Sequence, residues 1–372
     1  MDNKTVKIMS IFGTRPEGIK FAPIIHRFML TKWIDQITVN TGQHLEMLDQ
    51  VLNKFNIVPH YNLKVMKPNQ KLEEVTADMI VKISRILEQE KPELVVVLGD
   101  TATTFAGAYA AFLKGIPVGH IEAGLRTFDI YSPFPEEMYR QLVTRLSTYH
   151  FAPTTKNKEN LLSDNIKPDK ITVTGNPVID ALFEIGNRPH TYSKEFAQII
   201  DKGKRIILIT THRRENFSQL KNVYLAINQL VQSFPDIEVI FPVHLNPTVR
   251  KQVADYLLDN ERIHVTEPLD YETFVHIMKK TYMVITDSGG IQEEAPAFDI
   301  PVLVARESTE RPEGVTAGTL KVVGTSADSI IKEATRLLTD QKEYIRMAQS
   351  INPYGDGTAA IRIVEFLKLE LN

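Results

Sequence analysis

Three acidic residues lie at or near the ends of apolar segments and could transfer a proton to or from a ligand. Asp100 follows the apolar residues 94–98, Glu122 follows residues 118–121, and Glu136 lies in a proline-rich loop before a predicted helix. Neighbouring parallel strands bring their carboxyl ends together, so Asp100 and Glu122 are expected to lie close to each other. Converging carboxylates suit acid/base chemistry, because proximity and partial burial raise the pKa of one of them. Magnesium binding and, for Glu136, helix capping are the competing interpretations.

A second candidate site follows another apolar run. Residues 286–296 read Thr-Asp-Ser-Gly-Gly-Ile-Gln-Glu-Glu-Ala-Pro, which predicts the end of a strand, a tight turn and a helix. Ser288 is a candidate helix cap, and Gly289 and Gly290 leave backbone amides accessible to a ligand. These amides and the positive end of the helix dipole favour a phosphate, whereas Glu294, about one turn later, suits sugar hydroxyls. A turn that binds nothing is the competing interpretation.

The loop after the first apolar segment carries two basic residues. Thr14 and Glu17 have the spacing of a capping box, and Pro16 is placed in the first helical turn. Arg15 and Lys20 then lie near the positive end of a helix, where they suit a diphosphate or neighbouring carboxylates. Solvent exposure is the alternative for both. The glycine patterns of dinucleotide-binding folds and of P-loops are missing.

His212 follows the apolar residues 206–210 and is a candidate donor to a leaving phosphate, although a structural histidine is the competing interpretation. Polar residues also follow later strands of the second half of the chain, at 243–246 and 307–313. A cleft between two domains is the simplest site that these groups can share.

Composition limits the classes of function. The chain has 372 residues, a net charge of −3 and no cysteine. This length favours two domains, and the charge gives no basic field for nucleic acid. Without cysteine there are no disulfides, no thiolate catalysis and no zinc site of the usual structural type, which fits a reducing compartment. No signal peptide and no apolar run of about 18 residues is visible, so we expect a cytoplasmic protein that does not bind membranes.

Short β-branched runs alternate with helix-period segments, which is typical of parallel βαβ units. The predicted strands are 6–12, 37–40, 94–98, 118–121, 150–152, 171–173, 206–210, 239–241, 263–265, 282–286, 302–304 and 321–323. We therefore predict an α/β fold with two doubly wound parallel-sheet domains. A polar stretch around residues 175–204 is predicted to contain the linker between the two domains. The predicted domains are therefore 1–175 and 176–357. A last helix at 358–372 is predicted to pack on the first domain.

Taken together, the motifs closely resemble the non-hydrolysing UDP-N-acetylglucosamine 2-epimerases over nearly the whole chain. The resemblance rests on Gly-Thr-Arg-Pro-Glu at 13–17, Thr-Gly-Gln-His at 41–44, Gly-Asp at 99–100, His-Ile-Glu-Ala-Gly-Leu-Arg at 120–126, Ser-Pro-Phe-Pro-Glu-Glu at 132–137, His-Arg-Arg-Glu-Asn at 212–216, residues 286–296, Thr-Glu-Arg-Pro-Glu at 309–313 and Asn-Pro-Tyr-Gly-Asp-Gly at 352–357. Several motifs in one order are far more specific than any single motif.

The resemblance implies two Rossmann-like domains that face a cleft, the glycosyltransferase-B architecture, and reversible conversion of UDP-GlcNAc to UDP-ManNAc for surface polysaccharide. UDP would leave C1 in an anti elimination, and 2-acetamidoglucal would take it up again. The family has no cofactor and no catalytic metal, and it forms homodimers. Its catalytic residues map onto Asp100, Glu122, Glu136 and His212, and its substrate contacts map onto Arg15, Lys20, Phe274, Ser288, Gly289, Gly290, Glu294 and Arg311.

Bacterial relatives also bind a second UDP-GlcNAc as an activator. The corresponding positions here are Gln43, His44, Gln70, Arg213 and His244. Where relatives commonly have an arginine before the glutamine of this loop, the chain has Asn69, so weak or altered activation is expected.

Three alternatives stay open at the level of the sequence. A hydrolysing epimerase shares the elimination half of the reaction but releases free ManNAc and UDP. A retaining glycosyltransferase-B enzyme shares the fold, but many of these have a glutamate where this chain has Thr286. A UDP-sugar sensor without catalysis has no need for Asp100, Glu122 and Glu136 together.

Overall fold

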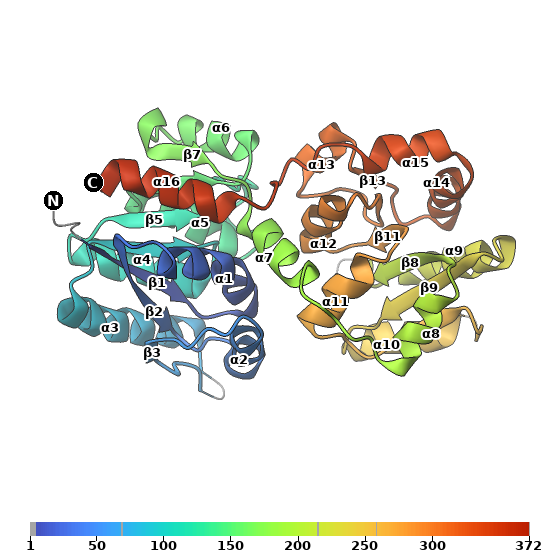
Figure 1. Ribbon diagram of the computed structural model, residues 1–372, viewed down its shortest axis with the longest axis horizontal. Helices are drawn as coiled ribbons and strands as arrows, with labels where there is room; N and C mark the ends of the chain where they lie inside the picture. The colour runs from blue at the N-terminus through green and yellow to red at the C-terminus, as the bar shows by residue number, and fades with distance from the viewer. Residues whose placement is uncertain (1–4, 68–69, 214–215, 258, 372) are drawn as a thin grey trace. The chain divides into compact units, whose positions relative to one another are not determined.

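The computed structural model describes residues 5–67, 70–213, 216–257 and 259–371 (Figure 1). Its contacts divide the chain into two compact units: unit 1 is Met1–Ala181 with Tyr354–Asn372, and unit 2 is Leu182–Pro353. The chain passes from unit 1 to unit 2 within a helix, α7 (Pro177–Gly186). Among the described residues, no helix has the length and apolar character needed to cross a membrane.

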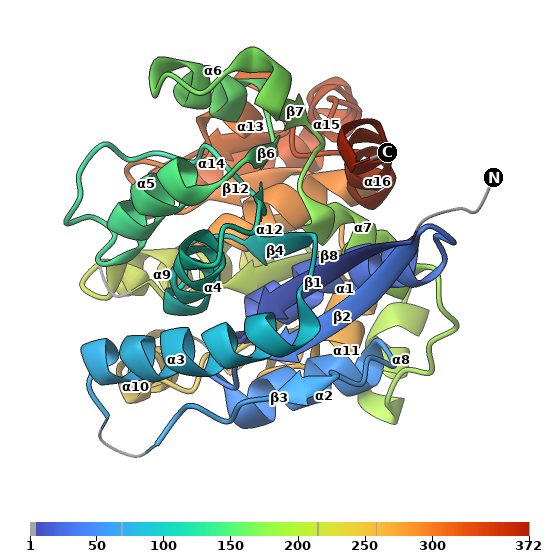
Figure 2. The same cartoon turned by 90° about the vertical axis from the view of Figure 1, so that its left-hand side faces the viewer.

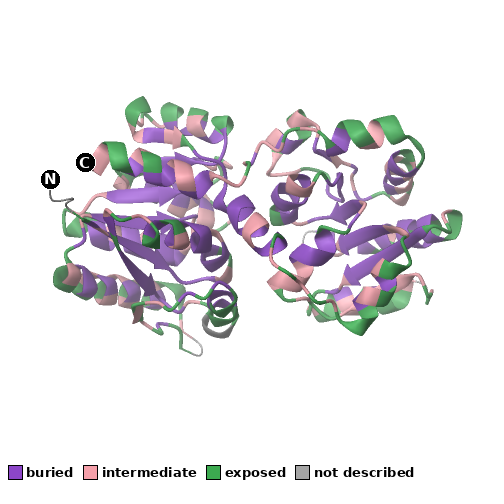
Figure 3. Cartoon of the chain, viewed as in Figure 1, coloured by how far each residue is buried: buried purple, intermediate pink, exposed green. Residues whose placement is uncertain are grey.

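Unit 1 contains a parallel sheet of seven strands in the order β3-β2-β1-β4-β5-β6-β7. The strands are β1 (Val6–Phe12), β2 (Ile34–Asn40), β3 (Tyr61–Asn62), β4 (Leu94–Leu98), β5 (Val118–Ile121), β6 (Tyr149–Ala152) and β7 (Ile171–Val173). Figure 3 shows the strands β1, β4, β5 and β6 as almost continuously buried, which is why their sequences are mostly apolar and do not alternate with exposed polar residues. The strand order reverses between β1 and β4, which are hydrogen-bonded neighbours in the sheet.

The helices of unit 1 form two layers, because right-handed crossovers place them on opposite faces on either side of β1. The helices are α1 (Arg15–Met29), α2 (Leu45–Lys54), α3 (Leu72–Glu90), α4 (Ala102–Leu113), α5 (Glu136–Leu146), α6 (Thr155–Ser163), the 3-10 turn η1 (Pro168–Lys170) and α16 (Ala359–Leu371). Helices α1, α2 and α16 form one layer, and α3, α4 and α5 form the other, as Figure 2 shows for unit 1.

Helix α16 comes from the end of the chain and is part of unit 1. Its N-terminus is held by Asp180, whose carboxylate accepts hydrogen bonds from the backbone N–H groups of Ala359 (3.1 Å) and Ala360 (2.9 Å). Farther along the helix, the Phe366 ring packs edge-on against Tyr149 and Phe151. The helix therefore completes the core beside β6.

Unit 2 repeats the architecture with a parallel sheet of six strands in the order β10-β9-β8-β11-β12-β13. The strands are β8 (Arg205–Thr210), β9 (Ile237–Pro242), β10 (Ile263–Thr266), β11 (Met283–Thr286), β12 (Val302–Val304) and β13 (Leu320–Val322). The helices are α8 (Lys194–Asp201), α9 (Leu220–Ser233), α10 (Pro247–Tyr256), α11 (Tyr271–Met278), α12 (Gly289–Glu294) with the 3-10 turn η3 (Ala295–Phe298), α13 (Pro312–Ala317), α14 (Ala327–Thr339) and α15 (Gln341–Ala348).

Both sheets have the strand order of doubly wound, Rossmann-like domains, so the predicted fold class is confirmed. All twelve predicted strands are present, with ends that differ by three residues at most. The strand β3, two residues long at the sheet edge, was not predicted, because so short a segment has no apolar run. In such folds ligands bind beyond the carboxyl ends of the strands beside the point where the order reverses. That rule selects the loops after β1 and β4 in unit 1 and after β8 and β11 in unit 2.

Candidate active site

The loop after β1 is fixed by one buried carboxylate. Glu17 accepts hydrogen bonds from the backbone N–H groups of Gly13 (2.9 Å) and Thr14 (2.8 Å), which completes the predicted capping box of α1. Its other oxygen accepts from the hydroxyl groups of Thr101 (2.5 Å) and Thr104 (3.1 Å) at the start of α4. Glu17 thus ties the ends of β1 and β4 to each other.

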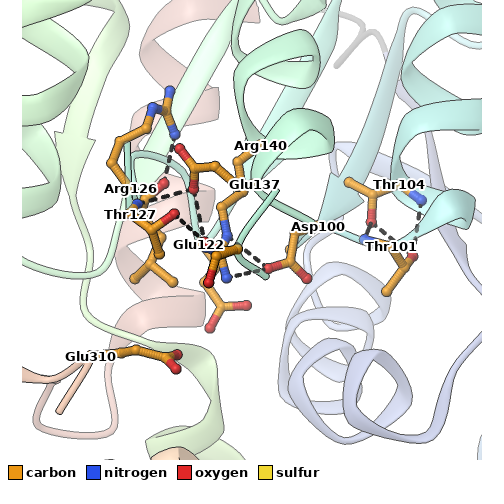
Figure 4. Close-up of polar contacts among 12 residues, drawn as sticks. Asp100, Thr101, Thr104, Glu122, Arg126, Thr127, Glu137, Arg140 and Glu310 are labelled. Atoms are coloured by element: carbon orange, nitrogen blue, oxygen red, sulfur yellow. Dashed lines mark hydrogen bonds and ion pairs between the residues drawn. The ribbon is translucent and has the colours of Figure 1, made fainter. Parts of the chain in front are cut away.

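Asp100 lies two residues after the end of β4 and is paired with an arginine that the sequence did not single out. The Arg140 side chain, on α5, donates from Nε to Asp100 Oδ2 at 2.8 Å, and its Nη2 is 2.8 Å from the same oxygen. Nη1 of Arg140 donates to Glu137 at 3.2 Å, as the dashed lines in Figure 4 show. Glu137 is fully buried and also accepts from the backbone N–H of Thr127. Arg140 therefore bridges two acidic residues.

Glu122 lies directly after β5, the neighbour of β4, and is paired with Lys20. The Lys20 Nζ donates to both carboxylate oxygens, at 2.6 and 2.7 Å, and Asn176 Nδ2 donates to Oε1 at 3.0 Å. The backbone of Glu122 has φ +64°, a left-handed conformation that is uncommon for residues other than glycine. Such conformations persist where the surroundings fix them, often at functional sites.

Electrostatics distinguish the two carboxylates at the strand ends. Burial raises the pKa of Asp100 above its ordinary value, the Arg140 guanidinium opposes this shift, and the nearby Glu122 adds to it. In contrast, the ammonium of Lys20 balances the negative charge of Glu122 within a distance at which charge-assisted hydrogen bonds are strong. Each carboxylate thus has a basic partner, Arg140 for Asp100 and Lys20 for Glu122, and burial raises the pKa of Asp100 despite that partner.

Glu136 and Arg15 are placed near this cluster in sequence, but the structure does not join them to it. Glu136 is the first residue of α5 and is half-buried. Among the described residues, no hydrogen bond or ion pair links it to Asp100 or Glu122. Arg15 is the first residue of α1 and is half-buried. The clustered acids are Asp100, Glu122 and Glu137.

In unit 2, His212 follows β8 and is held by the carboxylate that follows β11. Asp287, almost completely buried, accepts hydrogen bonds from the backbone N–H groups of His212 (3.0 Å) and Arg213 (3.0 Å). The imidazole Nδ1 of His212 is 3.3 Å from Asp287 Oδ1. Burial lowers the pKa of His212, and the Asp287 carboxylate opposes that shift. With Nδ1 turned towards Asp287, the Nε2 atom is left for a ligand.

The glycine turn after β11 lies beside two guanidinium groups. A Cβ atom added at Gly289 would be 3.5 Å from Nη2 of Arg213 and 3.7 Å from Nη2 of Arg311. Arg311 is also paired with Glu293. Ser288 occupies the N-cap position of α12 but, contrary to the prediction, its side chain makes no capping hydrogen bond within the described part of the chain. Instead its backbone N–H donates to the Thr286 hydroxyl at 2.9 Å.

Two other predicted binding residues, Gly290 and Phe274, lie on helices of unit 2. Gly290 is close to Glu294, since a Cβ added at Gly290 would be 3.3 Å from Glu294 Oε1. Phe274 is half-buried on α11.

Of the residues predicted to bind an activator, Gln43 accepts a hydrogen bond from the Thr103 hydroxyl at 3.0 Å, and the His44 N–H donates to the carbonyl of Gly13. The His244 ring stacks on His212 with centroids 5.8 Å apart. Gln70 accepts from the Lys67 N–H at 3.1 Å. Asn69, and residues 214–215 of the motif at 212–216, lie outside the described residues.

Comparison with known proteins identifies the family. Residues 27–368 match the family model described as UDP-N-acetylglucosamine 2-epimerase. A UDP-N-acetylglucosamine 2-epimerase of Bacillus subtilis is 48% identical over 365 residues, which cover 98% of this chain and 95% of that protein.

Solved structures give the same result. The UDP-GlcNAc 2-epimerase of Neisseria meningitidis, bound to UDP-GlcNAc, has a TM-score of 0.86 and 46% identity, with 98% of this chain and 100% of that chain covered. The S. aureus MnaA structure with UDP has a TM-score of 0.89 and 44% identity, with 99% and 97% covered. The chain therefore belongs to the UDP-N-acetylglucosamine 2-epimerase family, isomerases with two Rossmann-like domains of the glycosyltransferase-B type.

Proposed function

We propose that this protein interconverts UDP-GlcNAc and UDP-ManNAc without releasing the free sugar. The observation that supports this most directly is the placement of Asp100 and Glu122 after adjacent strands, one with a raised pKa and the other paired with Lys20. Epimerisation at C2 needs one group that removes a proton and one that returns a proton to the opposite face. Two carboxyl groups in different electrostatic settings meet this need.

The proposed reaction is an elimination followed by an addition. A carboxylate of unit 1 takes the C2 proton, the electron pair of the C2–H bond forms the C1=C2 double bond, and the C1–O bond breaks. The electron pair of that bond leaves with UDP, and an imidazolium at His212, favoured by the negative charges of Asp287 and of the diphosphate, donates a hydrogen bond to the departing group. In the second half, UDP attacks C1 of 2-acetamidoglucal while a carboxylic acid protonates C2 from the other face. The C2 hydrogen is not adjacent to a carbonyl group, so direct deprotonation would leave an unstabilised carbanion.

Nucleotide binding is proposed for unit 2, with a contribution from unit 1. Arg311 and the backbone at residues 288–290 would contact the diphosphate, Glu294 the ribose and Phe274 the uracil, while Arg15 would add positive charge. A second UDP-GlcNAc is proposed as an activator at Gln43, His44, Gln70, Arg213 and His244. The ManNAc produced would serve a surface polysaccharide.

The test is a single incubation of purified protein with UDP-GlcNAc in D2O, followed by proton NMR and mass spectrometry. UDP-ManNAc that carries deuterium at C2 is expected, because the returned proton comes from a group that exchanges with solvent. Free ManNAc with UDP would identify a hydrolysing enzyme. Product that keeps its C2 hydrogen would contradict proton transfer at C2, and unchanged, undeuterated substrate would indicate a binding protein.

A homodimer is also proposed, and the surface of unit 1 offers a face for it. Helices α3 and α4 contact each other, and Val81, Phe112 and Leu113 on them are 49%, 56% and 54% exposed. Contiguous exposed apolar patches often mark an interface, and we propose that these three side chains contribute to one.

The substitution Phe112→Asp is expected to shift the protein from dimer to monomer in sedimentation velocity, because a charge would be buried in the interface. Leu369→Asp is the control, since Leu369 is 84% exposed on α16, in the other helical layer. A Phe112→Asp protein that sediments as the unsubstituted dimer would place the interface elsewhere.

A further inference from the structure

Three side chains able to bind a metal ion meet in unit 2, on elements other than the loops that carry His212 and Gly289. They are His190, in the segment between α7 and α8, and Glu272 and His276 on α11. Each offers one ligand atom, and these atoms all lie within 4.8 Å of one another. Glu272 and His276 are four positions apart on a helix, so they share one face. These three residues are called the His190 cluster below.

His276 shows a feature expected of a metal ligand. The residue is only 6% exposed, and its Nε2 atom has no hydrogen-bond partner among the described residues. The imidazole does hydrogen-bond to the backbone of Ile185, so this bond is made through Nδ1. A ring that donates Nδ1–H to a carbonyl group presents a lone pair on Nε2, which is the usual arrangement of a metal-binding histidine. A buried acceptor left unpaired is otherwise unfavourable.

The charges beside the His190 cluster come from Glu272, which belongs to the cluster, and from Lys279, which is the C-cap residue of helix α11. The charge of Lys279 is directed to the carbonyl oxygen of Gly186, to which its Nζ donates at 2.8 Å.

Glu272 supplies negative charge to the cluster. Its Oε1 atom is 3.6 Å from Nδ1 of His190, and its side chain is 20% exposed. A carboxylate with two imidazoles forms a mixed oxygen and nitrogen ligand set. That set suits divalent transition metals such as zinc, cobalt and nickel better than it suits magnesium or calcium, which prefer oxygen ligands alone.

The rings of His190 and His276 are stacked, with centroids 4.4 Å apart and an angle of 7° between their planes. Lone pairs in parallel planes do not point at a common atom. Binding therefore requires one ring to turn, and His190 is the one that lies in a loop segment rather than on a helix. Glu272 and His276 form the preformed part of the site, and His190 closes it.

We propose that the His190 cluster binds one divalent transition-metal ion of the zinc class, with water in the remaining coordination positions. The ion would link the segment that follows α7 to helix α11. Phe274, proposed above for the uracil contact, lies between Glu272 and His276 on that helix. The site is separate from the proposed catalytic residues, and its existence does not depend on the proposed reaction.

The test uses the full-length protein, stripped with a chelator and then dialysed. Titration with zinc chloride by calorimetry is expected to show one equivalent bound. Cobalt(II) should give visible absorption bands of a low-coordinate nitrogen and oxygen site, and either ion should raise the melting temperature, because it binds the folded state. The variants His190→Ala and Glu272→Gln should each weaken binding by about 100-fold or more.

His264→Ala is the matched control. His264 also lies beside a glutamate in unit 2, with its Nε2 2.6 Å from Glu238, but it is not part of the His190 cluster. This variant should bind zinc like the unsubstituted protein. Circular dichroism of each variant without metal shows whether the fold is retained. If His190→Ala does not fold, Glu272→Gln still tests the site, because glutamine keeps the size and shape of the glutamate side chain. The proposal is overturned if the unsubstituted protein shows no saturable binding, or if both cluster variants retain it.

Discussion

Asp100→Asn should lower kcat by about 10²- to 10⁴-fold, the range expected when a general acid or base is removed. The amide keeps the size and shape of the carboxyl group, but it can neither accept nor deliver the proton at C2. Affinity for UDP should change little, because Asp100 lies in unit 1 beside Arg140 and the proposed diphosphate contacts are mainly in unit 2. Steady-state kinetics with UDP-GlcNAc, together with calorimetric titration with UDP, measure both quantities. Glu122→Gln is expected to behave in the same way.

Asp236→Asn is a matched control for this substitution. Oδ2 of Asp236 is contacted by Nε and Nη2 of Arg205 at 2.9 and 2.7 Å, the same pairing that Asp100 makes with Arg140. Asp236 lies in unit 2 and is exposed. The Asp236→Asn substitution therefore measures the effect of breaking an aspartate–arginine pair without removing a proposed catalytic group. Turnover should be unchanged. If Asp100→Asn retains normal kcat, or loses UDP binding to the same extent as turnover, the acid/base role is wrong, and the second result would favour a bound cation.

Gly124→Ala should destabilise the protein by about 3 kcal/mol or more, the largest stability effect that we expect from adding one methyl group. Gly124 has φ +89°, and a Cβ atom there would lie 2.2 Å from the carbonyl oxygen of Asn157 on α6. The helix cannot easily withdraw, because Nδ2 of Asn160 donates to the carbonyl of Gly124 at 3.0 Å. Since Glu122 is only two residues before this position, activity should fall as well.

The control is Gly115→Ala. Gly115 also has a left-handed backbone, φ +68°, but a Cβ atom there would have nothing within 4 Å. It should show only the conformational cost of that backbone, about 1–2 kcal/mol. The difference between the two variants in urea denaturation isolates the close approach of α6 to the loop after β5. Equal urea midpoints for the two variants would show that α6 moves away from the added methyl group at little cost in stability.

The sequence predicted the positions of the strands well because buried parallel strands leave continuous apolar runs. From those runs it also predicted that Asp100 and Glu122 are neighbours, and the pairing of Leu98 with Ile121 at the ends of β4 and β5 confirms this. The capping box of Thr14 and Glu17 was equally predictable, since its three-residue spacing is local. Features that depend on one element, or on the order of neighbouring strands, can be derived from a sequence.

Arg140 and Asp287 show what could not be derived. A charged residue in the middle of a helix is usually exposed, and only the packing of α5 against the sheet turns Arg140 towards Asp100. Asp287 lies in the segment 286–296 that predicts a strand end, but its hydrogen bonds to the backbone of His212 and Arg213 depend on β8 and β11 being neighbours. In both cases the sequence shows a charged residue, but it does not show which group that side chain contacts. The role of Glu136 stays a prediction, because its position in α5 does not bring it into the hydrogen-bonded cluster.

The return of residues 354–371 to unit 1 has a consequence for anyone who wishes to divide the molecule. Unit 2 is one uninterrupted stretch, so a gene fragment that encodes residues 182–353 contains all of it. Unit 1 is split, and a fragment that stops at Ala181 lacks α16, the two backbone donors that bind Asp180 and the Phe366 ring beside Tyr149 and Phe151. Unit 2 is in effect an insertion within unit 1. Expressing unit 1 alone therefore calls for a short artificial connection from residue 181 to residue 354, whereas a simple truncation would remove part of its core.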